Sequence, residues 1–295
     1  MIILKRAKDL REFIEVNKLR NQNIGFVPTM GALHAGHLSL LAVARAQCDL
    51  TICSIFVNPT QFNDPKDFEK YPITIEQDIY LLEKADCSVL FLPSVNEIYP
   101  NGVSLATHFE LGFLETILDG QYRPGHFQGV CQVMDRLLEI VQPNKLFMGQ
   151  KDYQQCMVLK KLLATNFPTT QFIMCPTQRE TDGLAMSSRN VRLNKEERQN
   201  AVKIFETLQF IKKNLVFGDL KVLKIKALIY LNENGFKVDY IELANSDTLE
   251  LKTNWDGQEP VVALIAAFLG GVRLIDNLCI TDTTNAPIIK LQRKL

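Results

Sequence analysis

Short apolar runs alternate with helical patterns from residue 24 to residue 177, and this alternation constrains the fold of the chain more than any other feature. The apolar runs have the composition of strands and lie at 24–27, 50–57, 88–93, 145–149 and 170–177. The helical patterns between them lie at 38–47, 75–85, 129–142 and 152–167. Because such alternation builds right-handed βαβ units, we predict an α/β fold with a Rossmann-like parallel sheet and helices on both faces.

The pattern changes near residue 180, where the sequence becomes polar and loses its periodicity. Helical segments, one strand and a hairpin that turns at two adjacent glycines follow in order at 195–215, 219–234, 237–245 and 261–280. Helices followed by an antiparallel pair are typical of an α+β unit. We therefore predict two domains: a Rossmann-like domain over residues 1–180 and a smaller, lid-like α+β domain over residues 181–295.

Charge and cysteine content exclude several classes of protein. The 33 Lys and Arg residues are balanced by 33 Asp and Glu residues, which argues against binding to nucleic acid or an anionic membrane. No apolar run approaches the ~20 residues of a membrane span, and charged residues follow Met1 too closely for a signal peptide. Seven cysteines without a CxxC pair indicate neither a metal site nor a disulfide framework. We expect a reduced, cytoplasmic protein.

The loops that follow the strands should carry the chemistry, because ligands of an open parallel sheet bind beyond the carboxyl ends of its strands. The densest polar sequences of the chain are found there, in PTMGALHAGH (28–37), NPTQF (58–62), GQKDYQQ (149–155) and MSSRN (186–190). We expect these four loops to converge.

The first loop is the most informative. It has neither dinucleotide-binding nor P-loop glycine spacing, but it places His34 and His37 three residues apart at the start of a helix. Both imidazoles can share one helix face near the positive end of the helix dipole, which suits a phosphate. Gly36 would let a base or ribose approach the backbone. These features predict a nucleotide site; the alternative is a chance pair in which one histidine caps the helix.

The other loops offer groups that fit a nucleotide and a carboxylic acid. Lys151 supplies a point charge for phosphate, although it can also be a surface lysine beside a helix cap at Asp152. Ser187, Ser188 and Arg189 offer hydroxyls and a guanidinium to a polyphosphate, or form a simple linker. Asn58 and Gln61 can bind a carboxylate or hydroxyl, or belong to an ordinary turn. Arg123 and His126, close to glycines, are further candidates, or part of a turn.

The order of these motifs resembles a known family. HxGH after the first strand and a serine-rich basic loop after the last resemble the superfamily of nucleotidyl transferases that includes class I aminoacyl-tRNA synthetases. FVPTMGALHAGH, SIFVNPTQF, RPGHFQGV, GQKDYQQ and GLAMSSRN, in this order, resemble the pantothenate synthetase (pantoate–β-alanine ligase) family more closely. The resemblance covers almost the whole chain and leaves out only the tail beyond about residue 281.

The resemblance implies an ATP-dependent ligase, with ATP and pantoate bound by the first domain. Pantoate is adenylated with release of pyrophosphate, and β-alanine then displaces AMP to give pantothenate. It also implies Mg²⁺ accompanying ATP as co-substrate, small-molecule partners only, and a homodimer. Two alternatives stay open: another nucleotidyl transferase, which adenylates phosphopantetheine or charges tRNA, and a catalytically silent nucleotide-binding module.

The family motifs imply three sets of site residues. The ATP-binding set is Met30, Gly31, Ala32, Leu33, His34, Ala35, Gly36, His37, Gly149, Gln150, Lys151, Asp152, Gln178, Met186, Ser187, Ser188 and Arg189. The pantoate and β-alanine set is Asn58, Gln61, Gln155, Arg123 and His126. The catalytic set is His34, His37, Lys151 and Arg189, with His37 the main candidate for donating a proton or stabilising charge.

The chain departs from the family pattern at three places. Gln150 replaces a glutamate and Gln178 a small aliphatic residue, and we expect altered fine tuning because backbone roles survive both changes. The acidic pair near residue 77 is reduced to Gln77-Asp78. Mg²⁺ is therefore expected to be held mainly by phosphates and water, with Asp78 as the candidate ligand from the protein.

Overall fold

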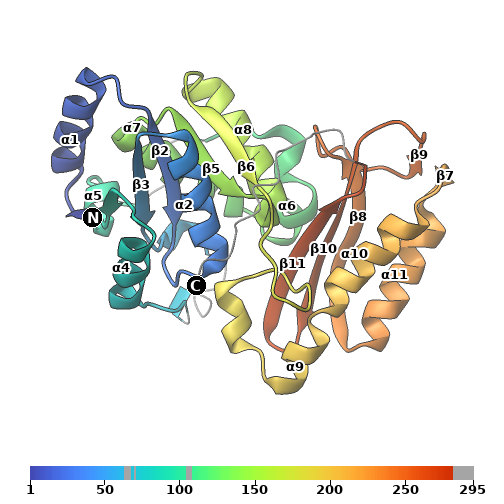
Figure 1. The fold of residues 1–295 in the computed structure, drawn as a ribbon. Coiled ribbons are helices and arrows are strands. Elements are labelled where there is room, and N and C mark those ends of the chain that lie inside the picture. The colour runs from blue at the N-terminus through green and yellow to red at the C-terminus, as the bar shows by residue number, and fades with distance from the viewer. Residues whose placement is uncertain (63–67, 70, 104–107, 282–295) are drawn as a thin grey trace.

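The computed structural model describes residues 1–62, 68–69, 71–103 and 108–281. In this part of the chain, six parallel strands form the main sheet in the order β1-β4-β3-β2-β5-β6 (Figure 1). The strands are β1 (Ile2–Leu4), β2 (Ile24–Thr29), β3 (Leu50–Ile55), β4 (Val89–Phe91), β5 (Lys145–Gly149) and β6 (Gln171–Cys175). The strand order reverses at β2, which lies between β3 and β5.

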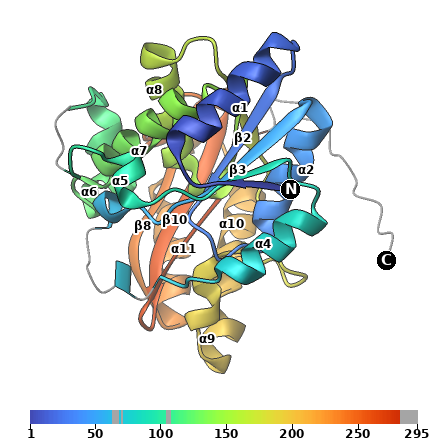
Figure 2. The same ribbon diagram turned by 90° about the vertical axis from the view of Figure 1, so that its left-hand side faces the viewer.

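Helices cover both faces of this sheet, as the alternating sequence predicts (Figure 2). One face carries α1 (Ala7–Leu19), α7 (His126–Val141) and α8 (Tyr153–Asn166), and the other carries α2 (Ala35–Gln47) and α4 (Ile75–Lys84). Successive strand residues point to opposite faces. Phe26 therefore packs with α7 and α8, whereas the next residue, Val27, packs with α2. The α/β prediction is confirmed.

The first twenty residues contain two elements that the sequence analysis did not predict. β1 pairs in parallel with β4 at the edge of the sheet, and α1 buries Leu10 and Ile14. A three-residue edge strand is too short to show a period, so its sequence carries no clear signal. Two predicted helices also begin three residues earlier than expected, because α2 starts after His34 and α7 starts after Gly125.

Shorter elements connect the main ones. They are η1 (Pro59–Gln61), α5 (Val95–Ile98), η2 (Gly112–Glu115), α6 (Leu118–Tyr122), η3 (Gln150–Asp152) and η4 (Ser188–Arg192). Among the described residues, no helix is both long and apolar enough to cross a bilayer.

After residue 194 the chain forms a smaller antiparallel sheet, confirming the predicted α+β part. The strands are β8 (Phe236–Asn245), β10 (Val261–Leu269) and β11 (Val272–Cys279), in the order β11-β10-β8. β10 and β11 form the predicted hairpin, and Gly270 at its turn has φ +55°. The predicted helix at 195–215 is divided, and the helices are α9 (Lys195–Asn200), α10 (Lys203–Asn214) and α11 (Lys221–Glu233). A short pair completes the unit: β7 (Gly218–Asp219) and β9 (Asn254–Trp255).

Both faces of the small sheet are covered along its central strand, β10. One face of β10 packs against α10 and α11, and Val262, Leu264 and Ala266 on the other face join the cluster that contains α7 and α8. The two sheets are therefore connected by continuous apolar packing, and the polar segment that runs from the end of β6 to η4 lies between them (Figure 1). The division at residue 180 stays a prediction.

Candidate active site

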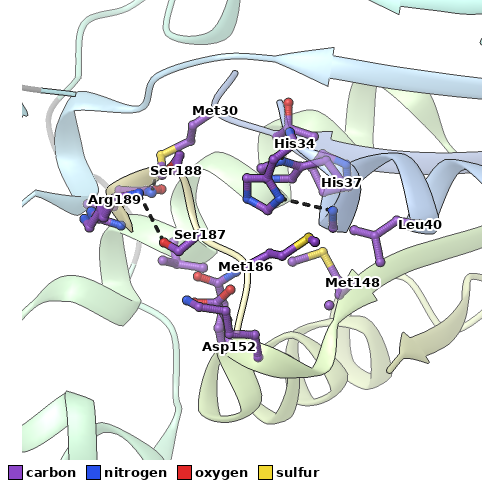
Figure 3. Close-up of a pocket in the computed structure, with 18 of the residues that line it drawn as sticks. Met30, His34, His37, Leu40, Met148, Asp152, Met186, Ser187, Ser188 and Arg189 are labelled. Carbon is purple, nitrogen blue, oxygen red and sulfur yellow. Dashed lines mark hydrogen bonds and ion pairs between the residues drawn. The ribbon is translucent and has the colours of Figure 1, made fainter. Parts of the chain in front are cut away.

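The four predicted loops meet at one cavity. It lies at the carboxyl ends of β2 and β5, where the strand order reverses and where ligands of parallel sheets usually bind. The predicted site residues that line it are Met30, His34, Gly36, His37, Asn58, Gln61, Gly149, Lys151, Asp152, Gln155, Gln178, Met186, Ser187, Ser188 and Arg189. Figure 3 shows the histidines on one side and, on the other, the loop that carries Ser187, Ser188 and Arg189, here called the serine loop.

The backbone fixes the tautomers of the two histidines. His34 is the N-cap of α2, and its Nδ1 accepts the N–H of Gly36 at 3.1 Å. His37 Nδ1 accepts the N–H of His34 at 3.3 Å. A neutral imidazole that accepts at Nδ1 carries its proton on Nε2. Both rings, whose centroids lie 4.1 Å apart, therefore have an Nε2–H group available to a ligand.

The surroundings keep both rings uncharged. Burial, together with the charge of Lys151, lowers the pKa of His34 to about 4. Burial and the neighbouring imidazole lower the pKa of His37 to about 3. At neutral pH the pair therefore presents neutral hydrogen-bond donors, and the basic side chains that line the cavity are those of Lys151 and Arg189.

A buried carboxylate supports the loop that leads to these histidines. Asp78 on α4 is 0% exposed and accepts the N–H groups of Ala32 at 3.0 Å and Leu33 at 2.8 Å. These bonds hold two consecutive left-handed residues, Gly31 (φ +84°) and Ala32 (φ +49°). Gly31, Ala32, Leu33 and Ala35 do not line the cavity. Both oxygens of Asp78 face backbone N–H groups, so its position does not suit a metal ligand.

The turn η3 brings Lys151 to the cavity. Lys151 and Asp152 both line it, and Lys151 Nζ lies 4.0 Å from Asp152 Oδ1. Asp152 occupies the N-cap position of α8 without a side-chain cap bond, so the suggested capping role is wrong. Gln150 lies outside the cavity, because its amide donates to Asn277 Oδ1 at 3.1 Å.

The serine loop closes the opposite side of the cavity. Ser187 Oγ accepts the N–H of Arg189 at 3.2 Å, and Ser188 Oγ lies 3.4 Å from the hydroxyl of Tyr71. The guanidinium of Arg189 lies 5.7 Å from the centre of the Tyr71 ring, within cation–π range. The N–H of Met186 donates to the carbonyl of Gln178 at 3.0 Å.

Amide side chains form one corner of the cavity. Asn58 is 1% exposed, and its Oδ1 accepts the hydroxyl of Tyr99 at 2.8 Å. Its Nδ2 donates to the carbonyl of Gly129 at 3.1 Å and to Gln61 Oε1 at 3.3 Å. Gln61 is thereby oriented beside Met30, whose Sδ accepts from Gln61 Nε2. A carboxylate or hydroxyl bound in this corner would meet amide donors.

Arg123 and His126 do not line this cavity. His126 Nδ1 donates to the carbonyl of Gln61 at 2.8 Å, and its Nε2 accepts from Arg123 at 3.0 Å. Burial and the charge of Arg123 lower the pKa of His126 to about 3. His126 thus supports Gln61 from behind, while Arg123 lines an adjacent small cavity that shares Lys151 and Arg189.

Sequence reasoning missed the apolar part of the cavity. Its members come from several elements and are Leu40, Phe56, Val130, Val133, Met134, Leu137 and Met148. The four that lie on α7 have the spacing of an ordinary helix face packed in a core, so no sequence signal distinguishes them from structural positions. Tyr71 and Thr177 also line the cavity, and Thr177 Oγ1 is buried without a hydrogen-bond partner in the described part of the chain.

The residues present suit a cation that arrives with its own ligands. Among the described residues, no three His, Cys, Asp or Glu side chains gather in a way that could hold a metal ion. Asp152 offers one carboxylate to the cavity. This donor set fits Mg²⁺, which usually keeps waters and phosphate oxygens and takes few ligands from the protein.

Comparisons with known proteins identify the same family that the order of the motifs indicated. A family model described as pantoate-beta-alanine ligase matches residues 2–279. The chain is 43% identical over 284 residues to the pantothenate synthetase of Cytophaga hutchinsonii, covering 95% of this chain and 99% of that protein. It is 41% identical over 284 residues to that of Bacteroides fragilis, covering 94% and 98%.

Solved structures show the same architecture. The pantothenate synthetase of Thermus thermophilus has a TM-score of 0.83 and 35% identity, covering 96% of this chain and 100% of that one. The pantoate-beta-alanine ligase of Francisella tularensis, whose structure is described as complexed with beta-gamma ATP and beta-alanine, has a TM-score of 0.79 and 42% identity, covering 95% and 98%.

Proposed function

The chain belongs to the pantoate–β-alanine ligase family, and on that premise we propose that it joins pantoate to β-alanine in an ATP-dependent reaction that yields pantothenate. The observation that carries the proposal is the cavity itself. Two neutral imidazoles, one ammonium, one guanidinium and an amide corner face one space at the carboxyl ends of β2 and β5. This combination of groups suits a nucleotide bound together with a small carboxylic acid.

ATP binds along the side of the cavity formed by α2 and the serine loop. Leu40, Met148 and Met186 give the adenine an apolar surface (Figure 3). The Nε2–H groups of His34 and His37 donate to phosphate oxygens, and the start of α2 adds its positive dipole end. Lys151 and Arg189 supply the positive charge that the neutral histidines lack.

Pantoate binds in the amide corner. Gln61 and Gln155 donate to its carboxylate and hydroxyl groups, and Asn58 holds Gln61 in place. The buried contacts of Asn58 with Tyr99 and Gly129 support this assignment, because they engage both polar atoms of Asn58 and so favour Gln61 as the group that meets the substrate. His126 and Arg123 act behind this corner on Gln61 and do not contact pantoate.

The reaction follows in two displacements. A carboxylate oxygen of pantoate attacks the α-phosphorus of ATP. The bond between the α-phosphorus and the oxygen that bridges it to the β-phosphorus breaks, and pyrophosphate leaves. The amine of β-alanine then attacks the acyl carbon of the adenylate, the bond to the phosphate oxygen breaks with the electron pair going to AMP, and the amine loses a proton. Negative charge grows on the phosphoryl oxygens in the first step, so the donors described above lower its barrier.

Mg²⁺ enters the site with ATP in this proposal, held mainly by phosphate oxygens and water. When bound, it neutralises part of the phosphate charge. Asp152, the carboxylate that lines the cavity, would be the residue of this chain to help hold it, whereas the hydrogen bonds of Asp78 support a structural role.

Two further properties follow from the family and belong to the same proposal: a homodimeric state and a cytoplasmic location without nucleic-acid or membrane partners. The balanced charge of the chain supports the absence of nucleic-acid and membrane partners. Sedimentation equilibrium of the purified protein tests the dimer, which predicts twice the 33.5 kDa of the chain.

A product assay tests the function. The purified chain with ATP, Mg²⁺ and pantoate should release pyrophosphate, and addition of β-alanine should then yield AMP and pantothenate. Omission of pantoate is the control. Pyrophosphate release that does not depend on pantoate would contradict the proposed substrate and favour another nucleotidyl transferase, and ATP binding without turnover would favour a silent nucleotide-binding module.

A further inference from the structure

A buried asparagine outside the cavity is hydrogen-bonded to the backbone of η3, the turn that carries Lys151 and is here called the lysine turn. Asn277 lies on β11 and is 2% exposed. Its Nδ2 donates to the carbonyls of Gln150 and Lys151, both at 2.9 Å. Its Oδ1 accepts from Gln150 Nε2 at 3.1 Å. One side chain from the small sheet therefore uses both of its polar atoms on the turn that carries Lys151.

The preceding residue fixes the other side of the site. Asp276 is 4% exposed, and its oxygens accept from two nitrogens of Arg179 at 2.6 and 3.0 Å. Arg179 also donates to the carbonyl of Gly183 and lies 4.1 Å above the ring of Phe205. Arg179 and Gly183 belong to the segment that leads into the serine loop. Two consecutive residues of β11 thus tie together the lysine turn and the serine loop.

These hydrogen bonds affect the direction in which the side chain of Lys151 points. The turn η3 is a single 3-10 turn between β5 and α8, so it has few backbone hydrogen bonds of its own. Two bonds to one amide group fix the peptide planes on either side of the Lys151 Cα. A displacement of about 1 Å at a catalytic group can lower a rate by about 100-fold, so the orientation of this backbone matters.

We propose that Asn277 is a positioning residue that aims the ammonium of Lys151 at the phosphates of ATP. It acts through Lys151 and does not contact substrate, since it is absent from the residues that line the cavity. The inference rests on the proposed function, because it assumes that Lys151 acts on ATP. An aspartate at this position has the same shape but no donor for the two carbonyls, so the role requires an amide.

A double-mutant cycle tests the proposal. Pyrophosphate release is measured in a single turnover at saturating ATP and pantoate for the unmodified chain, Asn277→Ala, Lys151→Ala and the double variant. We expect Asn277→Ala to lower the rate about 10-fold in the unmodified background and less than about twofold beside Lys151→Ala, since residues that act as a unit are not additive. Asn277→Ser, which keeps one donor, should lie between.

Asn17→Ala is the matched control. Asn17 is also a buried asparagine whose amide donates to a backbone carbonyl, that of Phe13, but it lies on α1 away from the cavity. It should lower the melting temperature and leave the rate within about twofold. A 10-fold loss from Asn277→Ala in both backgrounds, or no loss in either background, would overturn the proposal.

A second measurement separates this proposal from the proposed function. We expect the rise in melting temperature caused by ATP alone to shrink in both Asn277→Ala and Lys151→Ala. If the unmodified chain releases no pantoate-dependent pyrophosphate but Asn277→Ala still weakens the ATP-induced shift, the function is wrong and the positioning role stands. An undiminished ATP-induced shift in Asn277→Ala, with Lys151→Ala losing it, would refute the positioning role.

Discussion

Replacing Asp78 by alanine should loosen the loop that carries the histidine pair. The change leaves the N–H groups of half-buried Ala32 and buried Leu33 without their acceptor. Each orphaned buried donor costs about 1–3 kcal/mol, and removal of a buried charge returns part of that cost. We expect a net loss of about 3 kcal/mol, which corresponds to a fall of roughly 6–12 °C in melting temperature for a chain of this size.

Two readouts test this reasoning. Scanning calorimetry gives the melting temperature, and single-turnover pyrophosphate release gives the adenylation rate, which should fall about 10-fold or more because His34 follows the loop. Thr74→Val is the graded control: it removes one hydroxyl that donates to Asp78 at 3.1 Å and should cost about 1 kcal/mol. A melting temperature within about 2 °C of the unmodified chain would refute the structural role. An unchanged melting temperature with lost pyrophosphate release would instead restore Asp78 as a metal ligand.

The remaining predictions concern the imidazoles and the lysine. His37→Ala and Lys151→Ala should each lower the single-turnover adenylation rate about 100-fold or more, as for loss of one transition-state donor; near-normal rates in both would show that the phosphates lie elsewhere. The pKa of His126 is about 3 in the folded chain, against an ordinary value of 6.5. Below pH 6.5 the unfolded chain therefore binds a proton at this residue and the native chain does not, so the free energy of unfolding falls as the pH falls. Between pH 7 and pH 5 this should cost about 2 kcal/mol in urea unfolding, and His126→Gln should lose that much less over the same interval; an equal loss in both proteins would contradict the buried, neutral state of His126.

The parallel sheet and its helices could be predicted from the sequence because their signals are local. Strands and helices in such folds have different periods of apolar residues, and each predicted strand of the main sheet corresponds to an observed one. The position of the site could also be predicted, since parallel strands bring their carboxyl ends to one edge. The family resemblance is confirmed by the match over residues 2–279.

Other features gave no usable signal. The edge strand β1 is too short, and the apolar wall from α7 has the same pattern as a core face. The roles of individual residues within the candidate site stay predictions, but several positions differ from expectation. Gln150, Arg123 and His126 lie outside the main cavity. Hydrogen bonds to distant residues direct the side chains of Gln150 and His126 elsewhere, and Arg123 is bonded to His126.

By itself, the sequence determined which chemical groups stand at the ends of which strands. The tertiary structure decided what holds those groups in place: Asp78 beneath the loop of His34, His126 behind Gln61, and Asn277 on the carbonyls at Lys151. These partners are separated by 46, 65 and 126 positions. Hydrogen bonds act over about 3 Å in space, so no periodicity along the chain records them, and they exist only after the sheets have packed.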